Sequence, residues 1–361
     1  MSLSQINIGN KTTTVPIIQG GMGIGVSLSS LASAVANAGG IGVISGVQVG
    51  FREADFDRNT QEANLRGLSK EIRKAKELSP NGIIGVNLMV AIKNYADMVK
   101  VCLEEKVDLI ISGAGLPKDL PDLVKGSQTK IAPIVSSGKA AALLTKLWLR
   151  RYDYLPDLLI VEGPLAGGHL GYSFEELESE DIPKLEDLVV DVIEAIKPFE
   201  ESTGRKIPVI AAGGIYDGDD IKKFLGLGAT GVQMGTRFVA THECDASDEF
   251  KQNYVDAKEE DIDFILSPVG MPGQAIINPF IKRVKGKKEK ITKYYSCLTP
   301  CSPAIAPYCI STALINAVAG KADDGLIFIG KSGHKIDKIV SVDELIKELS
   351  SEINQVNGDE V

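Results

Sequence analysis

Two short apolar segments that stop at glycine constrain the fold of this chain more than any other feature. The first ends in Gly213 and Gly214, and the second, further along the chain, ends in Gly235 and Thr236. A strand that ends at glycine and leads into a helix leaves backbone N–H groups free to bind an anion, and glycine lets the backbone approach it closely. The last two strands of a (β/α)8 barrel bind phosphate in this way. We therefore expect these four residues to form a phosphate site, with two ordinary strand-to-helix turns as the alternative.

Apolar strand-like runs alternate with helical patterns from the start of the chain, which favours parallel β/α units. Candidate strands occupy residues 15–19, 41–45, 83–87, 109–112, 131–136, 158–162, 209–212 and 231–234. Helical patterns occupy residues 28–38, 65–78, 95–105, 139–149, 185–197 and 219–227. Eight strands with helices between them predict an α/β protein with a closed (β/α)8, or TIM, barrel.

After the eighth strand the pattern becomes irregular and rich in proline and glycine. Loops this long in a compact protein are usually functional, so we expect a lid that covers the mouth of the barrel and helps to bind substrate. A closing helix is expected at residues 339–349. The predicted division is a cofactor-binding barrel at 1–243, a lid insertion at 244–320 and a segment at 321–361 that packs back on the barrel.

Charge and hydropathy exclude several kinds of partner. The net charge of -9 argues against general attraction to nucleic acid or to an anionic membrane. No secretion signal and no long apolar run is found, so we expect a cytoplasmic protein. The exception in charge is a basic stretch at residues 282–290, which is either a solvated loop or a docking site for an acidic carrier or a phosphorylated cofactor.

The chain has five cysteines at uneven spacing, which argues against a disulfide framework. Three of them lie close together in the sequence, but their C-x3-C-x7-C spacing matches no zinc site. We expect no metal site and structural or incidental thiols, with a redox or metal role as the alternative, at Cys297, Cys301 and Cys309.

One of the three histidines, His169, follows the sixth predicted strand in a glycine-rich loop over the barrel mouth. An imidazole there can donate or accept a proton near neutral pH, or hold an anion. The surrounding glycines leave it little to pack against, which favours a functional role over a structural one. His242 and His334 lack such a setting.

The first predicted strand ends in a further glycine-rich turn. This turn does not match the G-x-G-x-x-G motif of Rossmann folds, because Val26 stands where the third glycine is required. A backbone shelf for a flat ring at Gly21, Met22 and Gly23 suits a barrel mouth better, with Met22 as a polarisable contact. Asn87, at the end of the third strand, is either a ring contact or a turn-forming residue.

Together, residues 16–23, 85–87, 166–169 and 211–238 resemble a family of flavin-dependent barrels that includes nitronate monooxygenases, formerly 2-nitropropane dioxygenases, and the FMN-type enoyl-ACP reductases. The resemblance covers the whole barrel and is more specific for the superfamily than for the reaction. It implies an oxidoreductase with a small-molecule substrate and His169 as the catalytic residue. It also implies FMN bound by Gly21, Met22, Gly23, Asn87, Gly168, Gly213, Gly214, Gln233, Gly235 and Thr236.

The resemblance leaves two reactions open. Nitronate oxidation by dioxygen is our first expectation, and NAD(P)H-dependent enoyl-ACP reduction is the second. The basic stretch slightly favours the second, because acyl carrier proteins are acidic. An acyl carrier protein and a second copy of the chain are accordingly the candidate protein partners.

The chain departs from the family pattern at three positions. Leu165 replaces the usual acidic residue before the Ala-Gly-Gly-His motif, Pro133 stands where some members have lysine, and Gln274 stands where related chains often have arginine. Two alternative functions are less favoured by the sequence. One is a flavin-binding module without catalysis, and the other is a sugar-phosphate isomerase that uses Glu162 with His169. An IMP dehydrogenase type of barrel would need a cysteine after the sixth strand, and none is there.

Overall fold

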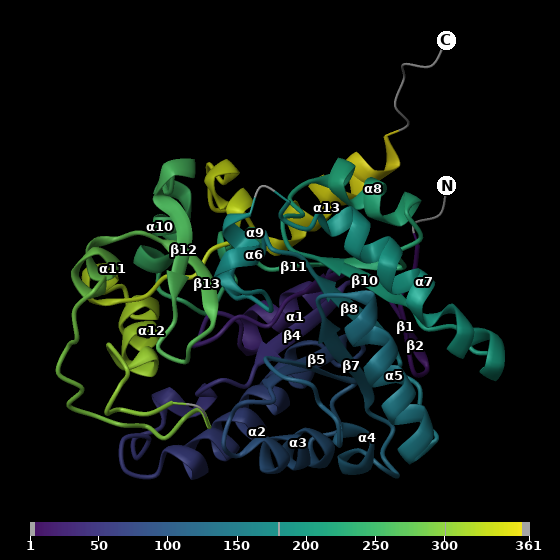
Figure 1. Ribbon diagram of the computed structural model, residues 1–361, viewed down its shortest axis with the longest axis horizontal. Coiled ribbons are helices and arrows are strands. Elements are labelled where there is room, and N and C mark those ends of the chain that lie inside the picture. The colour runs from purple at the N-terminus through teal and green to yellow at the C-terminus, as the bar shows by residue number, and fades with distance from the viewer. Residues whose placement is uncertain (1–3, 180, 300, 356–361) are drawn as a thin grey trace.

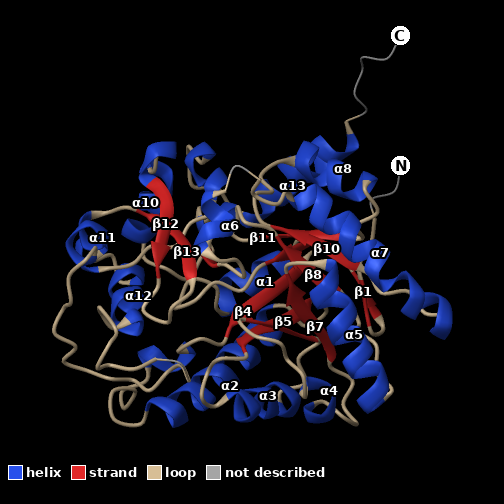
Figure 2. Ribbon diagram, viewed as in Figure 1, coloured by secondary structure: helices blue, strands red, loops and turns tan. Residues whose placement is uncertain are grey.

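The barrel expected from the sequence is present in the computed structural model, which describes residues 4–179, 181–299 and 301–355. Eight parallel strands close on themselves in the order β10-β11-β3-β4-β5-β6-β7-β8 (Figure 1 and Figure 2). The prediction of a TIM barrel is confirmed. The strand bounds lie within two residues of the predicted ones: β3 (Ile17–Gln19), β4 (Ile41–Ser45), β5 (Ile83–Met89), β6 (Leu109–Gly113), β7 (Lys130–Val135), β8 (Leu159–Glu162), β10 (Val209–Ala212) and β11 (Gly231–Met234).

Side chains of the strands alternate between the barrel interior and the helix layer, as strand geometry requires. In β8, Ile160 packs inside the barrel, whereas Val161 packs toward the helices. Because both faces are buried, the strands read as continuous apolar runs. The interior at the amino-terminal end of the strands also receives Ile6, which is fully buried beside an N-terminal hairpin of β1 (Asn7–Ile8) and β2 (Lys11–Thr12).

Helices cover the outside of the barrel (Figure 2). Those that follow the barrel strands are α1 (Ser29–Asn37), α2 (Thr60–Leu78), α3 (Tyr95–Glu104), α4 (Leu120–Leu123), α5 (Gly138–Tyr152), α6 (Phe174–Glu178), α7 (Leu185–Thr203), α8 (Gly218–Gly226) and α9 (Thr236–Val239). The chain then returns to the barrel wall, where α13 (Val342–Asn354) packs against α8 and α1. Within the described residues, no helix combines the length and apolar character that crossing a membrane requires.

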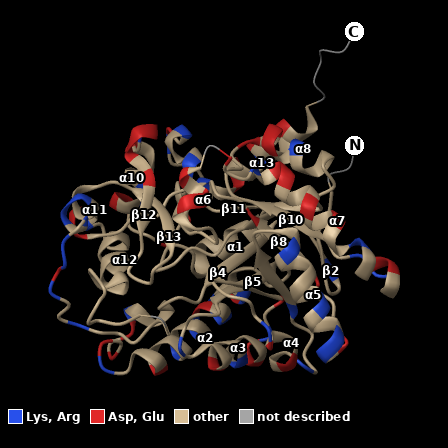
Figure 3. Cartoon of the chain, in the orientation of Figure 1, with Lys and Arg blue, Asp and Glu red and all other residues tan. Residues whose placement is uncertain are grey.

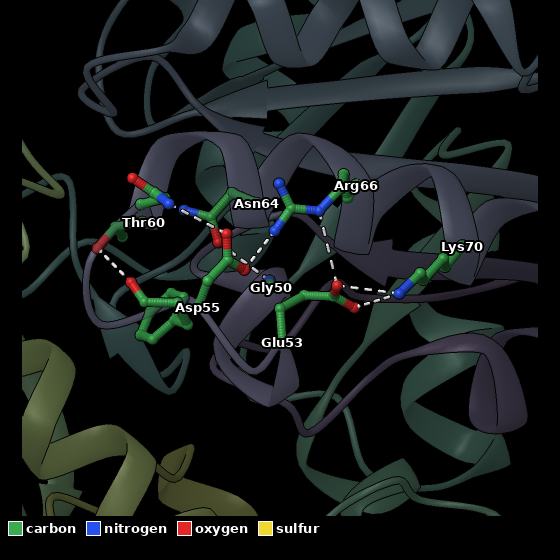
Figure 4. Close-up of polar contacts among 9 residues, drawn as sticks. Gly50, Glu53, Asp55, Thr60, Asn64, Arg66 and Lys70 are labelled. Atoms are coloured by element: carbon green, nitrogen blue, oxygen red, sulfur yellow. Dashed lines mark hydrogen bonds and ion pairs between the residues drawn. The ribbon is translucent and has the colours of Figure 1, made fainter.

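Helix α2 begins at Thr60, before the start at residue 65 that apolar periodicity predicts. Its first turns are polar and are tied to the segment that precedes the helix (Figure 4). The Asn64 side chain accepts the backbone N–H of Gly50 at 3.0 Å, and Lys70 pairs with Glu53 at 2.7 Å. Polar contacts of this kind do not contribute to the apolar periodicity from which the helix was predicted. The predicted helix was therefore too short at its N-terminus.

Residues 244–320 are more regular than the sequence pattern indicates. They contain α10 (Asp248–Asp256), β12 (Ile262–Leu266), β13 (Pro272–Ile276), α11 (Pro279–Val284) and α12 (Ile310–Val318). Strands β12 and β13 form an antiparallel hairpin, and β13 also pairs with β9 (Gly168–His169) in the loop after β8. All five residues of β13 are buried, so the alternation that reveals a half-exposed strand is missing. The three-part division of the chain remains a prediction.

Candidate active site

A cavity of about 280 Å³ lies at the carboxyl ends of the barrel strands, where active sites of such barrels are found. Every barrel strand or the turn after it contributes to the wall, and so do residues of the 244–320 segment. All of the site residues expected from the sequence line this one cavity: Gly21, Met22, Gly23, Asn87, Gly168, His169, Gly213, Gly214, Gln233, Gly235 and Thr236.

The turns after β10 and β11 form one end of the cavity, which we call the glycine end. Gly213 and Gly214 have φ angles of +97° and +85°, a backbone conformation that side chains disfavour. A Cβ atom on Gly214 would also lie 3.0 Å from Cβ of Leu165. Gly235 lacks a positive φ, but a Cβ atom there would lie 3.3 Å from Sδ of Met22. Glycine is therefore favoured by backbone conformation in the first turn, and in the second turn a side chain would require Met22 to shift.

One cationic side chain lines the cavity directly after the second of these turns. Arg237, the only cationic residue in the described lining of the cavity, pairs with Glu348 at 2.8 Å and lies over the ring of Tyr216 at 4.3 Å. The Gly214 N–H donates to no other group of the described chain, whereas the Gly214 carbonyl accepts the hydroxyl of Ser332 at 2.9 Å. A free backbone N–H in a turn of this kind can bind an anion.

The turn after β3 approaches Asn87 and Gln233 closely. A Cβ atom on Gly21 would lie 2.4 Å from Cβ of Asn87, so a side chain cannot be placed there without displacing Asn87. The Oε1 atom of Gln233 is buried and has no hydrogen-bond partner in the described part of the chain. A buried amide oxygen of this kind normally has a partner, so it indicates a ligand with a hydrogen-bond donor.

His169 is held more firmly than the sequence indicates. It lies in β9, its Nε2 atom is 2.7 Å from Oγ of Ser267, and its ring packs on Phe328 with 5.1 Å between the centroids. The expectation that glycines leave His169 little to pack against was therefore wrong. Burial lowers the pKa of His169 to about 4, so the imidazole is neutral at pH 7.

Neither Ser267 nor Phe328 is marked by a sequence motif. Ser267 lies in a Ser-Pro-x-Gly turn that predicts a loop, and no local signal connects it with a histidine 98 residues away. Phe328 lies beyond the predicted insertion and reaches the cavity because Ala275 of β13 bridges to it. Gln274, by contrast, pairs with Gly168 in the small sheet and does not line the cavity.

A family model described as nitronate monooxygenase matches residues 5–352 of the chain. The chain belongs to the nitronate monooxygenase family. It is 27% identical over 322 residues to a probable nitronate monooxygenase of Staphylococcus saprophyticus, a match that covers 81% of this chain and 84% of that protein.

The chain of this nitronate monooxygenase family member is also similar to two proteins whose names do not mention nitronates. The chain is 27% identical over 270 residues to (3aS,4S,5R,7aS)-5-hydroxy-7a-methyl-1-oxo-octahydro-1H-indene-4-carboxyl-CoA dehydrogenase of Mycobacterium tuberculosis, covering 75% of this chain and 65% of the relative's length. Among solved structures, FabK from Thermotoga maritima is 29% identical, with a TM-score of 0.72 and coverage of 94% of this chain and 92% of that chain.

In this nitronate monooxygenase family member, the only carboxylate in the described lining of the cavity is Glu162, at the end of β8. No described side chain pairs with its carboxyl group, although the Tyr172 hydroxyl donates to the Glu162 backbone carbonyl at 2.8 Å. Burial raises the pKa of Glu162 to about 7. The carboxyl group therefore holds its proton to a much higher pH than an ordinary glutamate.

One of the three clustered cysteines reaches the same cavity, whereas Cys309 lines a different pocket. Cys297 lines the cavity, and all five cysteines of the chain are free thiols. Burial raises the pKa values of Cys297 and Cys301, which makes both thiols poor nucleophiles at neutral pH. No group of histidine, cysteine and carboxylate side chains in the described residues has the geometry of a metal site. A structural role for these thiols remains our prediction.

Proposed function

We propose that this protein is an FMN-dependent oxidoreductase that oxidises alkyl nitronates with dioxygen. The observation that carries the proposal is the convergence, in one cavity of a nitronate monooxygenase family member, of a two-turn glycine cradle, two amide side chains and a neutral histidine. The cradle comes from β10 and β11, the amides from β5 and β11, and the histidine from β9.

The residues present fit FMN. Gly213, Gly214, Gly235 and Thr236 would hold the phosphate, because a Cβ atom at these glycines would crowd the cradle and the Gly214 N–H is free. Arg237 also lines the cavity, although its charge is largely balanced by Glu348. The orphaned Gln233 oxygen matches a donor on the flavin ring, and the side-chain-free surface at Gly21 leaves room for a flat group.

The chain's own groups would position the substrate and exclude water, while FMN, when bound, supplies the redox chemistry by taking electrons from the substrate and passing them to dioxygen. His169 is neutral at pH 7 and therefore acts on the substrate by hydrogen bonding rather than by its charge. The apolar part of the wall, which includes Met89, Leu298 and Phe328, keeps the substrate away from bulk water.

A second candidate is NAD(P)H-dependent reduction of an enoyl thioester carried by acyl carrier protein. The basic stretch supports it, since Lys282, Lys285 and Lys287 are exposed on and after α11, on the outer side of the 244–320 segment (Figure 3). Arg283 contributes less free charge, because it pairs with Glu289 and with Asp324. The carboxyl-CoA substrate in the name of the M. tuberculosis relative also points to a thioester.

The first test is the identity of the cofactor. Purified protein is heated and the released cofactor is identified by chromatography. We expect FMN, and recovery of FAD or of no flavin would contradict the proposal.

The second test identifies the electron donor. The yellow protein is mixed under anaerobic conditions with an alkyl nitronate and, separately, with NADH or NADPH. Bleaching by the nitronate alone, with oxygen uptake in air, supports the proposed function. Bleaching only by a reduced nicotinamide, with turnover that needs an enoyl thioester, would overturn it in favour of the second candidate.

A further inference from the structure

The hydrogen bond between His169 and Ser267 joins the loop after β8 to the hairpin of the 244–320 segment. The Nε2 and Oγ atoms are 2.7 Å apart, and Ser267 is 2% exposed. No other side chain of the described residues hydrogen-bonds to the His169 ring. Ser267 is therefore the group of the described chain that can orient the imidazole.

Backbone hydrogen bonds fix the position of Ser267. Its N–H donates to the Met271 carbonyl at 2.9 Å, and its carbonyl accepts the Gly270 N–H at 2.9 Å, which closes a tight turn after β12. The neighbouring strand β13 pairs with β9, where Gly273 is opposite His169. The serine and the histidine are therefore held in register by one small sheet, independently of the hydrogen bond between their side chains.

The direction of the hydrogen bond follows from the partners of the serine hydroxyl. A hydroxyl has one proton to donate and two lone pairs that accept. The other contact of Ser267 Oγ is the Val269 N–H at 3.5 Å, which can only donate. His169 Nε2 is therefore the one acceptor in the described chain for the serine proton. If Nε2 carried a proton instead, both the serine proton and the Nδ1 lone pair would lack a partner in the described chain, whereas the tautomer protonated at Nδ1 leaves only the Nδ1–H unpaired. Unpaired buried groups are disfavoured, so the second arrangement is preferred.

We propose that Ser267 is a positioning residue whose hydroxyl donates to Nε2 of His169 and holds the neutral imidazole in the tautomer protonated at Nδ1. Burial keeps the pKa of the ring well below 7, so the choice between neutral tautomers, rather than protonation, decides what His169 can do near neutral pH. The Nδ1–H has no partner among the described residues, and His169 lines the cavity.

The tautomer decides whether His169 donates or accepts a hydrogen bond toward the substrate. A ring protonated at Nδ1 offers a hydrogen-bond donor to an oxygen of the substrate, while the nitrogen that could accept a proton is already bound by Ser267. His169 would then hold an anionic nitronate oxygen without carrying a charge, rather than remove a proton as a base. This consequence rests on the proposed function, whereas the tautomer itself does not.

Nitrogen NMR of the FMN-loaded protein with 15N-labelled histidine tests the proposal without any substrate. The chain has three histidines, so the spectrum is simple, and a His169→Gln variant assigns the two ring nitrogens of His169. We expect Nδ1 to be protonated and Nε2 unprotonated in the wild-type protein at neutral pH. A protonated Nε2 in the wild type would overturn the proposal.

Two variants of Ser267 separate orientation from packing. In Ser267→Ala the serine donor is lost, so the Nε2-protonated tautomer should become populated, while in Ser267→Thr the hydroxyl remains and the wild-type pattern should return. Signals of His242 and His334 that stay in place report that each variant is folded. An Ala variant that folds and keeps the wild-type tautomer would refute the role of Ser267. If it does not fold, the wild-type and Thr spectra still decide the matter.

Turnover gives a second, independent measurement. With an alkyl nitronate, Ser267→Ala should lower kcat by about tenfold with little change in KM, and Ser267→Thr should restore most of it. Equal turnover of the Ala variant and the wild type would contradict the positioning role. Absence of nitronate turnover in the wild type would refute the proposed function instead, and the NMR result would still stand.

Discussion

Replacing Glu162 by glutamine should change how the stability of the protein depends on pH. Burial raises the pKa of this carboxyl group from 4.5 to about 7 in the folded state, so between those values the folded protein binds a proton that the unfolded chain does not. The protein therefore loses stability as pH rises from about 4.5 to about 7. Glutamine of nearly the same shape has no proton to lose, and this loss should be absent in the variant.

The size of the effect follows from the pKa shift. Each pKa unit corresponds to about 1.4 kcal/mol, so the full shift amounts to about 3 kcal/mol, and we expect about 2–3 kcal/mol after allowance for water in the cavity. His169 acts in the opposite sense, because burial lowers its pKa from 6.5 to about 4 and the protein gains stability as pH rises through that window. Both proteins contain His169, so its contribution cancels in their difference.

The assay is urea denaturation of cofactor-free wild-type and Glu162→Gln protein at about pH 5 and about pH 8. The advantage of the variant should grow by about 2–3 kcal/mol between the two pH values. Glu178→Gln, on the exposed surface of α6, is the matched control and should show no such change. If the Glu162 variant differs from the wild type by the same amount at both pH values, the carboxyl group is not desolvated as the structure indicates.

Three further predictions concern turnover and cofactor binding. His169→Ala should lower kcat for an alkyl nitronate roughly 10²–10³-fold while FMN remains bound, because one preorganised hydrogen-bond donor is lost. The exposed His242→Ala is the control, and unchanged oxygen uptake would exclude His169 from the mechanism. Gly214→Val should yield folded but colourless protein, because the left-handed backbone and the cradle exclude a β-branched residue; a fully yellow variant would place the phosphate elsewhere. A triple variant with serine at Cys297, Cys301 and Cys309 should keep its turnover, measured as nitronate-dependent oxygen uptake. A folded triple variant that binds FMN but is inactive would contradict a structural role for these thiols.

Much of the barrel could be predicted because its signals are local. The strands are short apolar runs bounded by glycine or by helix-forming residues, and the turn after β10 has left-handed backbone at Gly213 and Gly214, which glycine permits in any surroundings. The 244–320 segment lacked such signals. Strand β13 is fully buried and contains both proline and glycine, so neither alternation nor propensity distinguishes it from a loop.

The sequence by itself determined the number and order of the barrel strands, the glycine positions at their ends and the placement of one histidine over the barrel mouth. These properties depend on backbone conformation and side-chain period, which neighbouring residues impose. Tertiary structure alone decided that Ser267 is the partner of His169, that Phe328 packs on its ring, and that burial moves the pKa values of His169 and Glu162 in opposite directions. Hydrogen-bond partners and desolvation depend on atoms that only the closed fold brings together, so no local pattern can report them.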